Sequence, residues 1–320
     1  MQKEIFGWSS ERLPCPARVV RWGHHGRPVL LFPTAGGDFE EVERHGLIAA
    51  LAPLIDAGRI KVYSVDSVAG RHWIEKGQSP HYASRVQNQF HAFIYHELVP
   101  LIRQDCASRE IELVTSGASI GAFNAVAMLC RHPDAFRLAI GMSGTYDLSH
   151  YVRGYWNDDF YYSSPLHYLP GLGEDWQIER LRSRMVILAS GSGRWENIDE
   201  SWAMASVLGG KGIPNRVDDW GHGYDHGPEH RALAVMRAHR RQRREHHRRR
   251  RCRNRHVHDV RRGKVLCGED DRQKRHQRHA AADAEQSREE ADARAEREQH
   301  WKKRRIHWTS GSEQQVDLLL

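Results

Sequence analysis

The sequence predicts an α/β fold, with a mostly parallel central sheet flanked by helices and a disordered basic tail after it. Short, continuously apolar runs that end in loops predict strands buried on both faces of a sheet. These runs alternate with segments whose apolar residues recur at helical spacing. Charge separates the tail from the body, because residues 237–320 hold 25 of the 48 Lys and Arg residues but 14 of the 41 Asp and Glu residues. The body is therefore mildly acidic and the tail strongly basic.

The first half of the body contains two such runs and one amphipathic segment. "VLLF" at 29–32 is closed by a proline and, after two intervening residues, two glycines. "RIKVYSVD" at 59–66 is a second run of this type. Residues 88–103, "NQFHAFIYHELVPLIR", have helical periodicity and contain Pro100 as a candidate kink. We expect two buried strands followed by a crossover helix. The tip "WGHHGRP", with His24 and His25, is typical of a hairpin.

The second half of the body continues the alternation. Strands are predicted at "IELVTS", "FRLAIGMSG", "MVILAS" and "PNRVDDW", and helices at 120–133 and 201–209. Strands that alternate with helices imply a parallel sheet, and such sheets bind ligands at the carboxyl ends of their strands. An insertion at about 144–184 is rich in aromatic residues. It either covers a pocket or is a long ordered loop that packs its own aromatics.

The domain organisation follows from the composition. Residues 1–236 are expected to form one domain and residues 237–320 a low-complexity tail. Five cysteines without CxxC spacing argue against a disulfide framework and a zinc ribbon. No window approaches the roughly 18 apolar residues of a membrane span, and the N-terminus lacks the apolar run of a secretory signal. We expect a cytoplasmic protein that does not contact a membrane.

The tail has two interpretations. It contains "RRQRREHHRRRRCRNRHVHDVRRGK" and too few apolar residues to offset its chain entropy. Clustered guanidinium groups would bind nucleic acid non-specifically, although no nucleic-acid-binding module is present. We favour the alternative, a frameshifted extension of a GC-rich gene, because Arg, His and Ala are what such a shift tends to produce. Sequencing of the locus tests it, and a shifted frame without a "DWPxW"-like continuation would refute it.

The segment "LVTSGASIGAFNAVAML" carries the strongest chemical signal. Ser119 lies between Gly117 and Gly121, after a predicted strand and before a predicted helix. A turn this tight leaves no room for side chains two residues away, and it exposes the serine hydroxyl above the sheet. The backbone N–H of Ile120 would then face an oxyanion formed in acyl transfer. A serine that merely caps the helix is the alternative.

A serine nucleophile needs a base and a carboxylate that orients the base. After the strand "MVILAS", the loop offers Glu196 and Asp199; after "PNRVDDW" it offers His222 and His226. The order serine, acid, histidine is that of α/β hydrolases. A second oxyanion donor is expected from the loop "FPTAGGDF", with the amide of Ala35 as first choice and that of Gly36 as second.

These motifs resemble the putative esterase family of the α/β hydrolases, which includes esterase D and the mycolyltransferases. The resemblance covers about the first 226 residues and is carried by "VLLFPTAGG", "VYSVDS", "HELVPLIR", "GASIGAFNAVAMLCRHPDAF", "MSGTYDL" and "WENIDESWAMASVLGGKGIP". It implies an α/β-hydrolase fold with Ser119 as nucleophile, Glu196 as acid and His226 as base. Glu196 stands where relatives commonly have Asp, and the resemblance ends at His226.

The sequence thus predicts a serine hydrolase that cleaves a carboxylic ester or thioester through an acyl-enzyme. No cofactor or metal is implied, because the triad mechanism needs neither. The expected partner is a small ester substrate, and the oligomeric state stays open. The alternative is a catalytically impaired scaffold whose basic tail binds nucleic acid.

Overall fold

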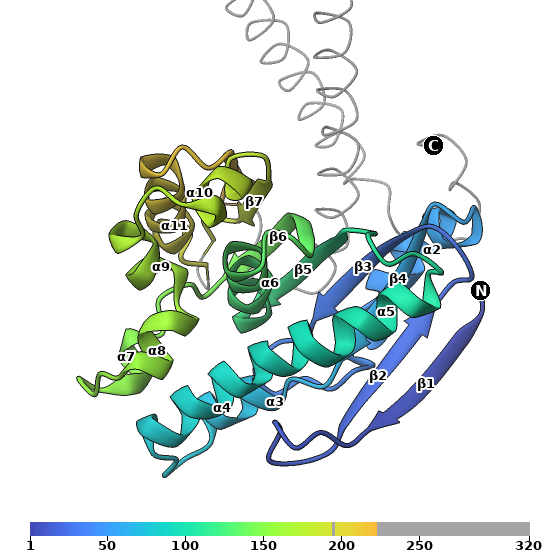
Figure 1. Cartoon of the computed structure of the whole chain (residues 1–320), viewed down its shortest axis with the longest axis horizontal. Coiled ribbons are helices and arrows are strands. Elements are labelled where there is room, and N and C mark those ends of the chain that lie inside the picture. The colour runs from blue at the N-terminus through green and yellow to red at the C-terminus, as the bar shows by residue number, and fades with distance from the viewer. Residues whose placement is uncertain (194–195, 223–320) are drawn as a thin grey trace, which may run out of the picture. The chain divides into compact units, whose positions relative to one another are not determined.

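A computed structural model describes residues 1–193 and 196–222 of the chain. An eight-stranded sheet, in the order β1-β2-β4-β3-β5-β6-β7-β8, forms its centre (Figure 1). The predicted tail, residues 237–320, and the predicted base, His226, lie outside the described residues. The strands are β1 Lys3–Trp8, β2 Ala17–Trp22, β3 Arg27–Phe32, β4 Ile60–Val65, β5 Leu113–Ser119, β6 Phe136–Gly144, β7 Met185–Ser190 and β8 Asn215–Asp219.

Helices connect these strands. They are α1 Glu41–Arg44, α2 Leu47–Asp56, α3 Val68–Ile74, α4 Pro80–Phe93, the π-helix Ile94–Leu98, α5 Val99–Asp105, α6 Ile120–Arg131, α7 Ser149–Val152, α8 Asp158–Ser163, α9 Pro165–Tyr168, the 3₁₀ turn Leu169–Gly171, α10 Trp176–Leu181 and α11 Ile198–Gly210. In the described part of the chain, none of the helices has the length and hydrophobicity needed to cross a membrane.

The predicted parallel sheet is confirmed from β3 and β4 through β8, since each neighbouring pair in that part of the sheet is parallel. Strands β1 and β2 are antiparallel additions that the sequence did not predict. The predicted hairpin at His24 and His25 is wrong. These histidines join β2 to β3, but β4 lies between those two strands in the sheet, so the turn is a crossover.

Side-chain alternation along the strands builds a core on each face of the sheet. Leu30 and Phe32 of β3 pack in the core under α4, α5, α6 and α11, whereas Val29 and Leu31 pack in the core under α1 and α2. Because alternate residues of a strand face opposite sides, a strand buried on both faces must be apolar throughout. This is the physical reason why the continuous apolar runs marked the strands correctly.

Pro100 shapes the predicted crossover helix without breaking it. The chain runs continuously from α4 through one π-turn into α5, and the Val99 N–H donates to the Ile94 carbonyl, five residues back. A proline ring clashes with the carbonyl four residues before it, here that of His96, and has no N–H to give. We attribute the wider turn just before Pro100 to the relief of that clash.

The predicted insertion at 144–184 folds into the short helices α7 to α10 at one end of the sheet (Figure 1). Part of its aromatic content is core: Tyr146, Phe160 and Tyr168 are buried, and Phe160 meets Trp73 of α3 edge-on. Other aromatics, Trp156 among them, are exposed. The buried members thus pack against the core and α3, outside the segment itself.

Two cations are buried between the first strands and α5. The Asp105 carboxylate lies 2.8 Å from both Lys61 Nζ and an Arg21 guanidinium nitrogen, and it accepts a hydrogen bond from the Tyr63 hydroxyl. Partial burial opposes ionisation of Asp105, but the hydrogen bonds from Lys61 and Tyr63 lower its pKa overall. A buried cation is tolerated only with such a partner.

Candidate active site

Ser119 stands at the turn between β5 and α6, and its backbone is strained. Its φ of 57° and ψ of −126° lie where non-glycine residues are rare. A Cβ on Gly117 would lie 2.3 Å from the backbone of Gly121, and a Cβ on Gly121 would lie 2.3 Å from the Phe32 carbonyl oxygen. Both glycines are therefore required sterically, as the sequence predicted.

The same contact brings the start of α6 close to the loop that carries Ala35. Gly121 touches the backbone of Phe32 and Pro33, so the start of α6 lies against the end of β3. Ala35 follows two residues later and packs against the apolar cluster that contains Ile120. Gly36, the second choice, is exposed. The structure thus places the loop after β3 beside the residue that follows Ser119.

Glu196 is held by two serine hydroxyls. Ser143 Oγ donates to Glu196 Oε1 at 2.7 Å, and Ser190 Oγ donates to Glu196 Oε2 at 2.9 Å. Ser143 lies in β6 and Ser190 ends β7, so the carboxylate is at the carboxyl edge of the sheet, where strand β5 also ends with Ser119. Sequence reasoning missed both serines, because each lies in a largely apolar strand. Ser143 is also 53 residues from Glu196 along the chain, and Ser190 is separated from it by a loop.

The alternative acid, Asp199, lies on the surface. It lies in the first turn of α11 and is exposed. Its neighbour Glu200 accepts the backbone N–H groups of Tyr146 and Asp147 and so ties α11 to the end of β6. Of the acidic residues in this segment, Glu196 is the one that the structure fixes with hydroxyl donors.

The alternative base, His222, is exposed and follows β8. Its Nδ1 lies 2.8 Å from the Ser192 carbonyl oxygen, which it can reach as a donor. That hydrogen bond occupies the ring nitrogen that would otherwise donate to Glu196. The preferred base, His226, falls outside the described residues, as stated above.

A buried polar network joins the start of α6 to α3 and α4. Gln87 accepts the Trp73 indole N–H at 2.9 Å and donates to Asn124 Oδ1 at 2.8 Å, while the Asn124 amide donates to the Ile120 carbonyl at 3.2 Å. His91 contacts both amides through Nε2 and is completely buried. Burial lowers the pKa of His91 to about 3, so the ring is neutral. The network connects α3 and α4 to the first turn of α6.

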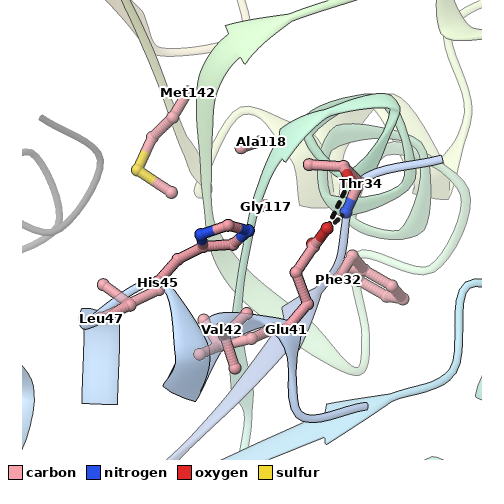
Figure 2. Close-up of a pocket in the computed structure, with 10 residues that line it drawn as sticks. Phe32, Thr34, Glu41, Val42, His45, Leu47, Gly117, Ala118 and Met142 are labelled. Atoms are coloured by element: carbon pink, nitrogen blue, oxygen red, sulfur yellow. Dashed lines mark hydrogen bonds between the residues drawn. The ribbon is translucent and has the colours of Figure 1, made fainter. Parts of the chain in front are cut away.

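A small pocket opens beside strand β5, between the ends of β3, β5 and β6 and helix α1. Figure 2 shows the Glu41 carboxylate turned toward Thr34, with the His45 ring and the Met142 thioether on the opposite side. Most of its lining is apolar. The pocket residues are Leu31, Phe32, Thr34, Glu41, Val42, His45, Leu47, Gly117, Ala118 and Met142. Among residues 1–193 and 196–222, no group of three or more His, Cys, Asp or Glu side chains is arranged to hold a metal ion.

The sheet order and the strained serine after β5 define the class of the protein as an α/β hydrolase. The sequence profile of the putative esterase family matches residues 47–313, and the chain belongs to this family. The match runs past His226, where the motif resemblance ended. A comparison with curated proteins gave no match.

Solved structures share the fold at low sequence identity. A ferulic acid esterase superposes with a TM-score of 0.55 at 18% identity over 73% of this chain and 95% of its own. S-formylglutathione hydrolase from Staphylococcus aureus superposes with a TM-score of 0.55 at 12% identity, over 74% of this chain and 96% of its own. MPT51 of Mycobacterium tuberculosis superposes with a TM-score of 0.54 at 17% identity, also over 74% of this chain and 96% of its own. Similarity at this level establishes the α/β-hydrolase fold.

The protein is accordingly a hydrolase of the esterase family, whose substrates are small esters. Neither the family nor the structural neighbours support the alternative of a nucleic-acid-binding scaffold.

Proposed function

We propose that the chain is a serine hydrolase that cleaves a carboxylic ester or thioester through an acyl-enzyme. Ser119 Oγ attacks the carbonyl carbon, and His226 accepts the hydroxyl proton and returns it to the leaving group. Glu196 accepts the other imidazole N–H and holds the ring in place. The backbone N–H groups of Ile120 and Ala35 stabilise the tetrahedral oxyanion. Water then hydrolyses the acyl-enzyme by the same route.

The strained backbone of Ser119 is the observation that carries this proposal. A serine that only capped α6 would need no positive φ, and its side chain would accept a hydrogen bond from the helix, but no such bond is present at this cap. A positive φ at a strand-to-helix turn lifts Oγ away from the sheet, as a nucleophile requires.

The position of Glu196 supports its role as the acid. Two hydroxyl donors, from Ser143 and Ser190, each bind one oxygen of the carboxylate and restrict its orientation. The engagement of His222 with a backbone carbonyl favours His226 as the base, in agreement with the motif resemblance. A cytoplasmic location remains part of the proposal.

The test is to measure hydrolysis of p-nitrophenyl acetate and labelling by a fluorophosphonate, using the full chain. Wild-type protein should gain one adduct that maps to Ser119, and Ser119→Ala should lose both labelling and turnover. Ser183→Ala, a change at an exposed serine after α10, is the matched control and should behave as wild type. Turnover that survives in Ser119→Ala would refute the assignment of the nucleophile.

A further inference from the structure

The loop after β3 is anchored by one carboxylate. Glu41, the first residue of α1, accepts the Thr34 backbone N–H on Oε2 at 2.7 Å and the Thr34 hydroxyl on Oε1 at 2.6 Å (Figure 2). Both oxygens of the carboxylate therefore bind a single residue. Thr34 immediately precedes Ala35, whose amide is the second oxyanion donor in the proposed mechanism.

The rest of the loop fits around this contact. The Gly37 N–H donates to the Thr34 carbonyl at 3.0 Å, which closes a turn around Ala35. A Cβ on Gly37 would lie 2.6 Å from the Glu41 carboxylate, so glycine is what allows the carboxylate to approach. On the other side, a Cβ on Gly70 of α3 would lie 2.9 Å from the backbone of Ala35. Ala35 is thus confined between the Glu41 anchor and α3.

Neighbouring carboxylates have a different role. Glu40 and Glu43 form ion pairs with Lys3 near the N-terminus of the chain. Within residues 1–193 and 196–222, the Glu41 side chain forms no ion pair, and Thr34 is the residue that donates hydrogen bonds to its carboxylate. A charged acceptor that binds a backbone N–H forms a stronger hydrogen bond than a neutral one.

We propose that Glu41 is a positioning residue that holds the Thr34–Ala35 peptide so that the Ala35 N–H points at the oxyanion. This inference rests on the proposed serine-hydrolase function. Glu41 does not touch the reacting atoms in this role. It fixes a donor before the reaction begins, which is the condition under which an oxyanion donor contributes to the rate.

The consequence is an effect on the transition state with little effect on substrate binding. A donor displaced by a fraction of an ångström stabilises the oxyanion less, but it leaves the ground-state contacts of the ester largely intact. Glu41→Gln keeps one acceptor oxygen, and we expect kcat to fall about tenfold. Glu41→Ala removes both acceptors, and the fall should approach the roughly hundredfold loss of a missing oxyanion donor. Thr34→Val removes the hydroxyl bond alone and should resemble Glu41→Gln.

The experiment measures kcat and KM for p-nitrophenyl acetate, together with the inhibition constant of phenylboronic acid, whose serine adduct is tetrahedral like the transition state. In Glu41→Gln and Thr34→Val, kcat and boronate affinity should fall by the same factor, while KM changes less than about threefold. Glu40→Gln removes a carboxylate one residue away that does not contact the loop, and it is the matched control. If Glu41→Ala does not fold, the two conservative variants still decide the question.

The outcomes separate this inference from the proposed function. An inactive Ser119→Ala together with unchanged or increased kcat in Glu41→Gln would overturn the role of Glu41 alone. A rise in KM without a change in kcat or boronate affinity would also overturn it, because it would indicate a contact with substrate. Activity that persists in Ser119→Ala would overturn both.

Discussion

Gly121→Ala tests whether the contact between α6 and β3 sets the geometry of the site. The new Cβ would lie 2.3 Å from the Phe32 carbonyl oxygen and 2.5 Å from that of Pro33, whereas real Cβ atoms stay beyond 3.0 Å. The start of α6 must therefore move by at least about 0.7 Å relative to β3. Overpacking of this kind costs about 1–3 kcal/mol of folding free energy. The movement also displaces the Ile120 amide relative to the loop that carries Ala35, and a shift of this size can reduce kcat about a hundredfold.

Thermal unfolding and ester turnover are the measurements for this variant. For a domain of this size, each kcal/mol lowers the Tm by about 2–4 °C. The matched control is Gly209→Ala in α11, where the nearest atom to the new Cβ is at 3.8 Å and alanine should gain about 0.5–1 kcal/mol. Wild-type kcat and Tm in Gly121→Ala would show that the contact does not control the serine turn.

Three further predictions follow from other contacts. Ser143 has a φ of 46°, and its hydroxyl donates a hydrogen bond to Glu196. Ser143→Gly should therefore raise the Tm, because it removes the backbone strain, and lower kcat, because it removes the hydroxyl. Unchanged turnover would contradict the role of Ser143. His91 is neutral when folded, with a pKa of about 3 against an ordinary 6.5, so below pH 6.5 the unfolded chain binds a proton that the native chain excludes. Stability should therefore fall toward pH 3 with a slope of up to about 1.4 kcal/mol per pH unit, and His91→Gln should flatten the pH profile of urea unfolding. Asp105→Asn leaves the buried Lys61 without its carboxylate, whereas Arg21 keeps its ion pair with Glu4, and the change should cost about 3 kcal/mol in urea unfolding; a loss under 1 kcal/mol would refute the pairing.

The parts of the fold that were predicted correctly are those whose burial is evident from the local sequence. The parallel strands β3 to β7 are largely apolar and buried on both faces, so their sequences identify them without knowledge of their neighbours. Strands β1 and β2 form an antiparallel edge, and β1 is largely exposed, so their sequences carry a weaker signal. In the sheet, β4 lies between β2 and β3, although β2 and β3 are consecutive in the chain. The turn sequence at His24, which joins β2 to β3, does not show that a third strand lies between them.

The candidate site divides in the same way. The tight turn at Ser119 was predictable because Gly117, Ser119 and Gly121 lie within five residues and the turn leaves no room for a Cβ at either glycine. The hydroxyls that hold Glu196 come from other strands, and the carboxylate that anchors Thr34 comes from the next helix. Such contacts arise from tertiary packing between ordinary residue types, and no spacing in the sequence distinguishes them from surface polar residues.

Backbone strain gives evidence for the site that is independent of any resemblance. Among the described residues, four other than glycine have positive φ: Ala107, Ser119, Ser143 and Arg153. Ala107 and Arg153 follow the ends of α5 and α7, where the left-handed conformation commonly terminates a helix. The two serines have no such local cause, and they lie at the carboxyl ends of the adjacent strands β5 and β6. Strain of this kind persists only where the surroundings enforce it, and it concentrates at functional sites. The strain therefore indicates a functional site at the carboxyl edge of the sheet, where Ser119 lies and where Ser143 binds Glu196.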